Sequence, residues 1–149
     1  PGKTGLSYVF APPGGQDTMN GLNAADYLWI MQRQAVLELA EKGSCVIVGR
    51  CADYILRENP DCLHVFIHAD TKFRAERIVR LYGESEKSPE LRLKDKDARR
   101  SANYKHFTGR EWGQCRNYHL SLDSGVIGAD NCVDLIVRLA AGKMLLTEE

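Results

Sequence analysis

The sequence predicts an α/β fold with a mainly parallel sheet. After residue 44, short apolar runs alternate with segments of helical periodicity, which is the order of consecutive β-α-β units. Residues 45–48 (CVIV) and 63–69 (LHVFIHA) are largely apolar runs that suit strands covered by helices on both faces. Hydrophobic residues make up 44% of the 149 residues, so we expect residues 1–149 to form a single domain with a real core.

Capping residues and chain breakers place the individual elements. In chain order we predict strands at residues 6–10, 45–48, 63–69 and 119–123, and helices at 23–42, 52–57, 71–81, 88–104 and 129–141. Asn23, Asp70 and Ser88 are good N-caps for three of the helices. Gly43 and Gly142 suit the left-handed residue that ends many helices. The aromatic segment 107–117 is broken by glycines and has no helical period, so we expect it to be irregular.

Composition argues against several classes of protein. No apolar run approaches the roughly 20 residues of a membrane span, and no signal peptide is recognisable, so we expect a cytoplasmic protein without membrane contact. The five cysteines are odd in number and irregularly spaced, which favours reduced thiols over a disulfide framework or a zinc site. The four histidines form no ligand pattern, so no metal site built from side chains is predicted.

Charge is unevenly distributed although the net charge is zero. Residues 71–116 contain 13 of the 20 Lys and Arg but only 7 of the 20 Asp and Glu, so this segment carries +6 and the remainder carries −6. A basic segment within a neutral domain favours a local anion site over a general nucleic-acid surface. The expected partners are therefore small anions such as nucleotides, while formation of a homo-oligomer is left open.

The first candidate site follows the predicted strand at 45–48. Ligands of open α/β sheets bind beyond the carboxyl ends of the strands, where Gly49 allows the backbone to turn and Arg50 projects into the crevice. A guanidinium group matches a phosphate bidentately. The alternative is an arginine paired with a neighbouring acid.

Two further candidates lie in the basic segment. Arg74, Arg77 and Arg80 recur at helical spacing after the strand at 63–69, where they form either an anion site or a solvated face. The densest group of cations follows: Lys94, Lys96, Arg99, Arg100, Lys105 and Arg110. Asp95 and Asp97 offset only part of this charge. A mobile basic lid would supply the cations and exclude the water that phosphoryl transfer requires. The alternatives are a basic surface helix or a nucleic-acid contact in which aromatic side chains stack on bases.

Taken together, these segments resemble a known family. CVIVGRCADYIL, LHVFIHADTKFRAERI, KDKDARRSANYKHFTGREWG and NYHLSLDSGVIG are similar, in order and spacing, to the cytidylate-kinase-like proteins of the nucleoside monophosphate kinase branch. The similarity extends over about residues 6–140. It implies a three-layer P-loop kinase-like domain with a helical basic lid at about residues 83–117. It also implies ATP with Mg²⁺ as the donor and a nucleoside monophosphate such as CMP or dCMP as the acceptor.

The resemblance also implies roles for particular residues. The catalytic positions expected in the lid are Arg99, Arg100 and Arg110. The positions expected to bind the acceptor or its phosphate are Gly49, Arg50, Asp53, Arg77, Arg80, Lys96 and Asp97. Cytidylate kinases carry Gly-Arg-Asp after this strand, whereas this chain has Cys51 at the third position, which leaves the pyrimidine specificity open.

The beginning of the sequence departs from the family pattern. Gly2-Lys3-Thr4 is similar to the end of a phosphate-binding loop, but no strand precedes it and prolines follow it, so we do not expect a P-loop there. We therefore expect the chain to be the C-terminal part of a kinase-like domain without its first strand and P-loop, and to be inactive by itself. Two alternative functions remain: a non-catalytic nucleotide-binding or regulatory module, and a nucleic-acid-binding domain that uses residues 72–110.

Overall fold

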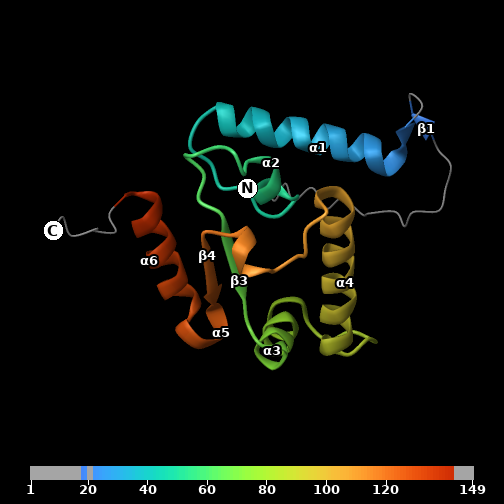
Figure 1. Ribbon diagram of the computed structural model, residues 1–149. Helices are drawn as coiled ribbons and strands as arrows, with labels where there is room; N and C mark the ends of the chain where they lie inside the picture. The colour runs from blue at the N-terminus through green and yellow to red at the C-terminus, as the bar shows by residue number, and fades with distance from the viewer. Residues whose placement is uncertain (1–17, 20–21, 143–149) are drawn as a thin grey trace, which may run out of the picture. The chain divides into compact units, whose positions relative to one another are not determined.

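The computed structural model describes residues 18–19 and 22–142 (Figure 1). The predicted strand at 6–10 and Gly2-Lys3-Thr4 lie outside these residues. The chain divides into two compact units, residues 1–45 and 46–149, and each unit is described by itself. The prediction of one domain over residues 1–149 stays a prediction.

The first unit contains a short antiparallel ribbon and one long helix. Strands β1 (Thr18–Met19) and β2 (Leu22–Asn23) pair with each other, and α1 extends over Ala24–Glu41. The side chain of Asn23 accepts the backbone N–H of Asp26 at 2.9 Å, and its amide donates to the Asp26 carboxylate at 2.7 Å. This cap satisfies one of the N–H groups that a helix leaves without a partner at its start, and it confirms the predicted beginning of the helix.

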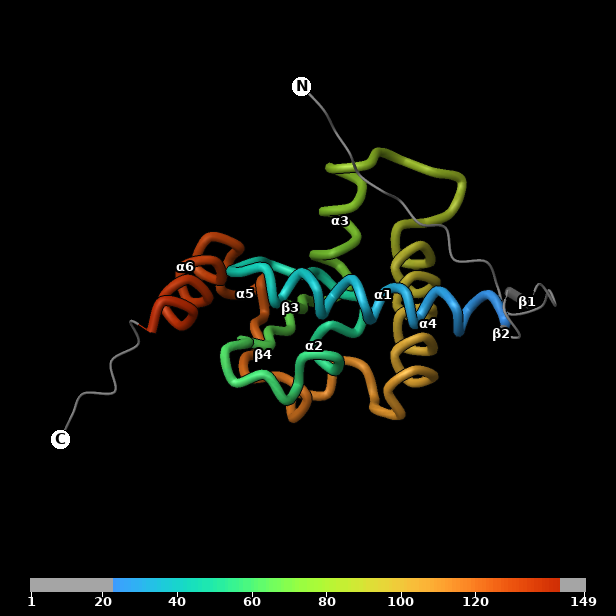
Figure 2. The backbone as a smooth tube through the Cα atoms, turned by 90° about the horizontal axis from the view of Figure 1, so that it is seen from above, coloured from blue at the N-terminus to red at the C-terminus, as the bar shows by residue number. Residues whose placement is uncertain are grey.

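The second unit is mixed α/β. Its elements are α2 (Ala52–Ile55), β3 (Val65–His68), α3 (Thr71–Tyr82), α4 (Pro89–Thr108), a 3-10 turn (Cys115–Asn117), β4 (Leu120–Asp123), α5 (Ser124–Ile127) and α6 (Ala129–Ala140). Strands β3 and β4 pair in parallel, with Val65 opposite Leu120 and His68 opposite Asp123. Helices follow both strands, and α3 and α4 lie side by side in both views (Figures 1 and 2). The α/β class and the parallel pairing of the two strands are confirmed.

The N-caps of α3 and α4 are also those predicted. The carboxylate of Asp70 accepts the N–H of Phe73 at 2.9 Å, and the hydroxyl of Ser88 accepts the N–H of Leu91 at 3.3 Å. Helix α4 continues one turn beyond the predicted end at residue 104 and stops at Gly109, whose φ of 70° is left-handed. The missing helical period of residues 107–117 suggested an earlier end, but Phe107 and Thr108 are still helical and Gly109 is the actual cap.

The predicted strand at residues 45–48 is wrong for this structure. These residues form no strand, and the side chains of Val46 and Val48 are 92% and 86% exposed. An apolar run indicates side chains that burial would stabilise, but a strand also needs a neighbour for its backbone hydrogen bonds. Strand β3 is likewise less buried than predicted, since Ile67 remains 45% exposed.

The core of the second unit gathers around α2, α4 and β4. Its buried side chains are Cys51, Ala52, Ile55, Leu56, His64, Ala75, Leu93, Tyr104, Leu122 and Cys132. The loop after α4 packs on β3, because the ring of Phe66 meets Trp112 edge-on at 5.5 Å and Tyr118 at 4.9 Å between centroids. No helix within residues 22–142 is both long enough and apolar enough to pass through a membrane.

Candidate functional site

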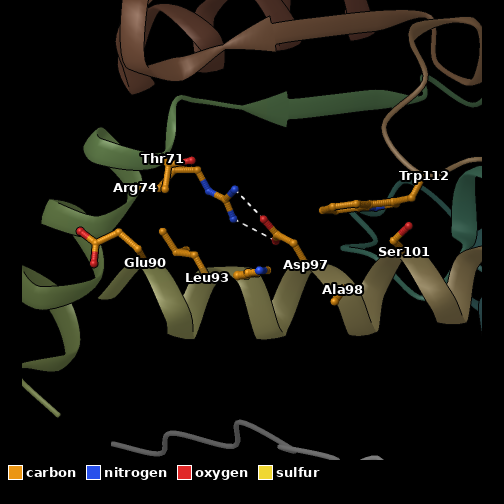
Figure 3. A pocket seen from close by; sticks show the side chains of 9 residues that line it. Thr71, Arg74, Glu90, Leu93, Asp97, Ala98, Ser101 and Trp112 are labelled. Atoms are coloured by element: carbon orange, nitrogen blue, oxygen red, sulfur yellow. Dashed lines mark hydrogen bonds and ion pairs between the residues drawn. The ribbon is translucent and has the colours of Figure 1, made fainter. Parts of the chain in front are cut away.

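Helices α3 and α4 line a pocket of about 560 Å³ (Figure 3). Its lining residues are Thr71, Arg74, Glu90, Leu93, Lys94, Asp97, Ala98, Ser101 and Trp112. Helix α3 starts three residues after β3 ends, so Thr71 and Arg74 lie just beyond the carboxyl end of a parallel strand. That end is where open α/β sheets bind their ligands.

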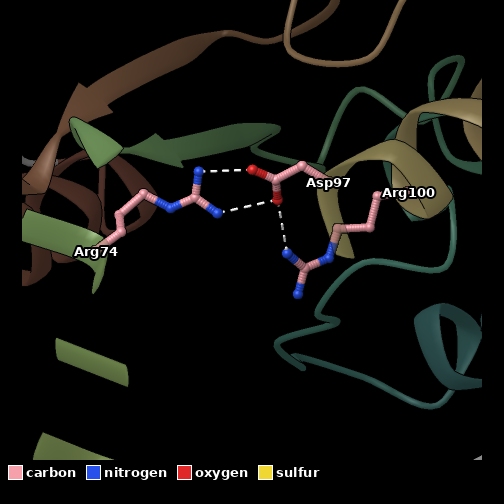
Figure 4. Close-up of polar contacts among 3 residues, drawn as sticks. All are labelled: Arg74, Asp97 and Arg100. Carbon is pink, nitrogen blue, oxygen red and sulfur yellow. Dashed lines mark hydrogen bonds and ion pairs between the residues drawn. The ribbon is translucent and has the colours of Figure 1, made fainter. Parts of the chain in front are cut away.

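A three-residue ion-pair cluster lies at this pocket (Figure 4). The guanidinium of Arg74 on α3 donates to both carboxylate oxygens of Asp97 on α4, at 2.7 and 2.9 Å. Arg100 donates to the same carboxylate at 3.2 Å from one turn further along α4. The two parallel contacts of Arg74 form the bidentate geometry that planar guanidinium and carboxylate groups favour. Asp97 therefore connects α3 to α4 and holds two cations at one point.

The electrostatics of the cluster favour the charged forms of Asp97 and Arg74. Burial alone would raise the pKa of Asp97, but the hydrogen bonds and charges of Arg74 and Arg100 outweigh it and hold this pKa below its ordinary value. The hydrogen bond to Asp97 in turn raises the pKa of Arg74. Of the five N–H donors of a guanidinium, the bidentate pair uses two on Arg74, so its geometry leaves donors for an anion.

The far end of the pocket is aromatic. Figure 3 shows the Trp112 ring beside Ser101, with an edge of the ring directed toward the Arg74–Asp97 pair. The ring is held in place by Phe66, and Gly113 allows this close packing because a Cβ there would lie 3.1 Å from the Phe66 ring. The pocket thus combines cations, a hydroxyl and a flat apolar surface. That combination suits a ligand with a planar ring and an anionic group.

A second cluster surrounds the turn at Arg50. Gly49, Arg50 and Cys51 have successive φ angles of 72°, 57° and 55°. Left-handed conformations are costly for residues with a Cβ, so this turn is strained at two positions. Cys51 is buried, and burial followed by the charge of Asp53 raises the pKa of its thiol to about 11. The side chain at the third position of the Gly-Arg-Cys triplet is therefore a neutral core group.

Helix α2 ties this turn to the end of α4. The buried hydroxyl of Tyr104 donates to the Asp53 carboxylate at 2.6 Å. Next to it, the ring of Tyr54 lies under the guanidinium groups of Arg57 and Arg110, at 4.3 and 5.2 Å from its centroid. Burial, followed by the hydrogen bond to Asp53, raises the pKa of Tyr104, so its hydroxyl stays protonated. Of these two adjacent residues of α2, Asp53 thus contacts α4 itself, and Tyr54 contacts Arg110 just after the end of α4.

The two clusters share one face of α4. Asp97 and Tyr104 are seven residues apart, which is about two helical turns or roughly 10 Å along the axis. Ser101 lies between them at helical spacing and lines the pocket. Helix α4 therefore connects the Arg74–Asp97–Arg100 cluster to the Asp53–Tyr104 contact.

The predicted site residues are distributed between clusters and surface. In the first cluster Asp97 pairs with Arg100. In the second cluster Asp53 contacts Tyr104 of α4, and Arg110 contacts Tyr54 of α2. Lys96 lies 5.9 Å from the centroid of the Tyr82 ring. Three arginines, Arg77, Arg80 and Arg99, are exposed, and within residues 22–142 they form no ion pair. The proposed binding and catalytic roles remain predictions.

Sequence reasoning missed the residues that complete the clusters. The spacing of Arg74 leaves open an anion site or a solvated face, and the sequence gives Tyr104 and Trp112 no role beyond the general alternative of aromatic stacking on bases. The signal for Arg74 was its helical spacing to the other arginines, which did not indicate a carboxylate partner 23 residues away. The part of the chain that the structure describes holds no group of three or more His, Cys, Asp or Glu that could bind a metal ion.

Comparisons with known proteins agree with the resemblance. No curated protein matches the chain. A crystal structure of an uncharacterized protein from Eubacterium ventriosum ATCC 27560 is similar, with a TM-score of 0.68 and 30% sequence identity. The similarity covers 79% of this chain and 65% of that protein, so the chain spans less than two thirds of its length. The model of the cytidylate kinase-like family matches residues 8–126, and on that match the chain belongs to this family, whose name indicates a kinase-like enzyme.

Proposed function

We propose that this chain is the acceptor-binding and lid part of a kinase that transfers a phosphoryl group from ATP to a nucleoside monophosphate, with a CMP- or dCMP-like acceptor. The observation that carries the proposal is the Arg74–Asp97–Arg100 cluster, of which Arg74 and Asp97 line the same pocket as Trp112. Two guanidinium groups are presented together on one carboxylate, opposite a flat aromatic side chain. Phosphoryl transfer needs cations positioned around a highly charged transition state, and the family membership supports a kinase-like reaction.

The predicted residues take the following roles in this proposal. Arg50 binds the acceptor phosphate. It belongs to the strained turn, whose backbone conformation sets the direction of its side chain. Arg100, with the exposed Arg99 beside it, approaches the transferred phosphoryl group as the lid closes. Asp97 holds Arg100 beside Arg74 until the nucleotide phosphates compete for the two guanidinium groups.

The described residues fit the phosphates of ATP better than they fit an ion held by protein alone. Arg74, Lys94 and Arg100 supply cationic donors at the pocket or its edge, whereas no cluster of three potential metal ligands occurs in the described part of the chain. Mg²⁺ is commonly held by one or two carboxylates together with substrate phosphates and water. When bound with ATP, it would neutralise charge on the phosphates, while the arginines orient them.

The proposal includes the three-layer P-loop kinase fold, of which these residues would form the acceptor and lid side. Parallel β3 and β4 with helices after each strand support it. The exposed Val46 and Val48 also support it, because apolar side chains in such a run suit burial within a larger sheet. Exposed Val133 and Val137, which share one face of α6, fit a further packed layer in the same way.

A kinetic assay tests the proposal. Full-length protein is incubated with ATP, Mg²⁺ and each of CMP, dCMP, UMP and AMP, and diphosphate formation is measured. Arg50→Ala should raise the KM for the acceptor about tenfold or more, as expected when a charge-assisted hydrogen bond is lost, while Arg100→Ala should mainly lower kcat. Alanine retains a Cβ at position 50, so the strain of the turn is unchanged. Arg138→Ala on α6, which removes an exposed cation outside the site, should leave both constants unchanged.

Three results separate this proposal from the alternatives. Unchanged kinetics in both arginine variants would remove the assigned roles. Nucleotide binding without turnover would identify a regulatory module, and DNA binding that falls steeply with salt but ignores nucleotides would identify a nucleic-acid-binding domain. We expect the 149 residues alone to transfer no phosphate, so turnover by that chain alone contradicts this part of the proposal.

A further inference from the structure

We propose that Asp53 is a positioning residue that ties the turn carrying Arg50 to α4, the helix carrying Arg100, through the hydroxyl of Tyr104. The kinetic effect that we expect rests on the proposed function. The structural link between the turn and α4 does not depend on that function. It gives Asp53 a role that differs from direct contact with the acceptor.

The turn needs an external restraint because its backbone is strained. Arg50 and Cys51 both have a Cβ and both adopt φ near 55°, directly after left-handed Gly49. Two such residues in sequence are costly and persist where the surroundings determine their conformation. A turn left to itself would relax and carry the Arg50 side chain with it.

Helix α2 transmits a restraint to this turn. Ala52 donates its N–H to the carbonyl of Gly49 at 3.1 Å, and Ile55 donates to the carbonyl of Cys51 at 2.9 Å. The four residues of α2 are therefore hydrogen-bonded directly into the strained segment. A contact that fixes the position of Asp53 within α2 therefore also restrains the turn.

Tyr104 is well placed to hold Asp53. Its side chain is only 4% exposed, and its hydroxyl is 2.6 Å from a carboxylate oxygen of Asp53, which is a short and charge-assisted hydrogen bond. Because Tyr104 belongs to α4, the contact links segments 51 residues apart in the chain. The guanidinium of Arg110 over the Tyr54 ring adds a second contact between the same two regions.

The groups around the Asp53 carboxylate suit a fixed structural bond. The charge of Asp53 raises the pKa of Cys51, Tyr104 and Tyr118, although burial is the larger cause for each of the three. These neighbours are thus neutral hydroxyl and thiol groups. The hydroxyl of Tyr104 donates directly to the Asp53 carboxylate at 2.6 Å and fixes its position.

The experiment compares four variants of the full-length protein: Tyr104→Phe, Asp53→Ala, Asp53→Asn and the double variant Tyr104→Phe/Asp53→Ala. Tyr104→Phe keeps the ring and removes only the hydroxyl. Asp53→Asn removes the charge but keeps an oxygen that can accept from Tyr104. Tyr82→Phe is the matched control, since it removes a hydroxyl from a side chain that is 72% exposed.

Hydrogen exchange and steady-state kinetics are measured on each variant. Tyr104→Phe and Asp53→Ala should each increase amide hydrogen exchange in residues 46–58. Each should also raise the KM for the acceptor about tenfold, because a hydrogen bond to a charged group contributes on that scale. The KM for ATP should change less than about twofold. The double variant should be no worse than the single ones, and Asp53→Asn should recover most of the loss. Tyr82→Phe should match the wild type.

Each contrary result overturns a distinct claim. Unchanged hydrogen exchange in residues 46–58 of Tyr104→Phe overturns the claim that Tyr104 restrains the turn through Asp53. A large effect of both Asp53 variants without any effect of Tyr104→Phe overturns it too, because Asp53 then acts on the acceptor itself. Equal rises in both KM values show general loosening instead of positioning. A wild-type protein without phosphoryl transfer overturns the proposed function, and the exchange data alone then decide whether Tyr104 holds the turn.

Discussion

Replacing Asp97 with Asn tests whether the Arg74–Asp97–Arg100 cluster holds α3 against α4. The substitution keeps the size of the side chain but removes its charge and one of its two acceptor oxygens. The bidentate pair with Arg74, at 2.7 and 2.9 Å, cannot survive intact, and the contact of Arg100 at 3.2 Å loses its charge. Arg74 would be left half-buried without its counter-charge.

The expected cost follows from the burial of the pair. The side chains of Arg74 and Asp97 are 29% and 25% exposed, which places them between surface pairs and fully buried pairs. Surface pairs contribute up to about 1 kcal/mol, whereas breaking a fully buried pair costs about 3–5 kcal/mol. We therefore expect Asp97→Asn to lower the free energy of unfolding by about 2 kcal/mol, which is roughly 4–8 °C in Tm for a chain of this size.

Thermal and denaturant unfolding at pH 7 and low salt measures the change, and Asp95→Asn is the matched control. Asp95 lies two residues away on the same helix and pairs with Lys87 at 3.0 Å, but these side chains are 37% and 61% exposed. The control removes the same charge by the same substitution and should cost less than about 0.5 kcal/mol. If Asp97→Asn destabilises no more than Asp95→Asn, the cluster does not hold the two helices together.

Two further predictions concern buried or crowded positions. Burial, followed by the neighbouring charge of His119, lowers the pKa of His64. The His64 imidazole therefore binds a proton more readily in the unfolded chain, so the free energy of unfolding should fall as the pH drops below about 6.5. His64→Gln should reduce that fall, as measured by denaturant unfolding at pH 7 and pH 5. An equal fall in the variant and the wild type would contradict the assignment to His64. Gly113→Ala should lower Tm more than Gly109→Ala, because both glycines have left-handed φ angles of 77° and 70° but only at Gly113 does a Cβ meet Phe66, at 3.1 Å. Equal Tm values would remove the packing argument.

The beginnings of the helices were predictable because capping is local. Asn23, Asp70 and Ser88 each accept a backbone N–H three residues further on, so residue type and position suffice to identify them. The parallel pairing of the predicted strands at 63–69 and 119–123 was predictable for a related reason. An apolar run before each helix and the order of the elements restrict the topology to a parallel sheet. The family was recognisable from the same segments in their order.

Partners that lie far apart in the chain could not be predicted. Many cations near Asp97 were equally plausible partners by spacing, and the packing of α3 on α4 selected Arg74, 23 residues away. Asp53 resembled a ligand for the acceptor until the fold brought Tyr104 to it from 51 residues away. In both cases the geometry of one side chain depends on the crossing of two helices.

By itself, the sequence determined the helix starts, the α/β class and the family, because caps, periodicity and motif order are properties of neighbouring residues. Only the tertiary structure decided which charged side chains form ion pairs with each other and which apolar runs pair as strands. Residues 45–48 have the composition of a buried strand, yet Val46 and Val48 are exposed. Burial and strand pairing require a partner surface, and hydrophobicity along the chain does not specify where that partner is.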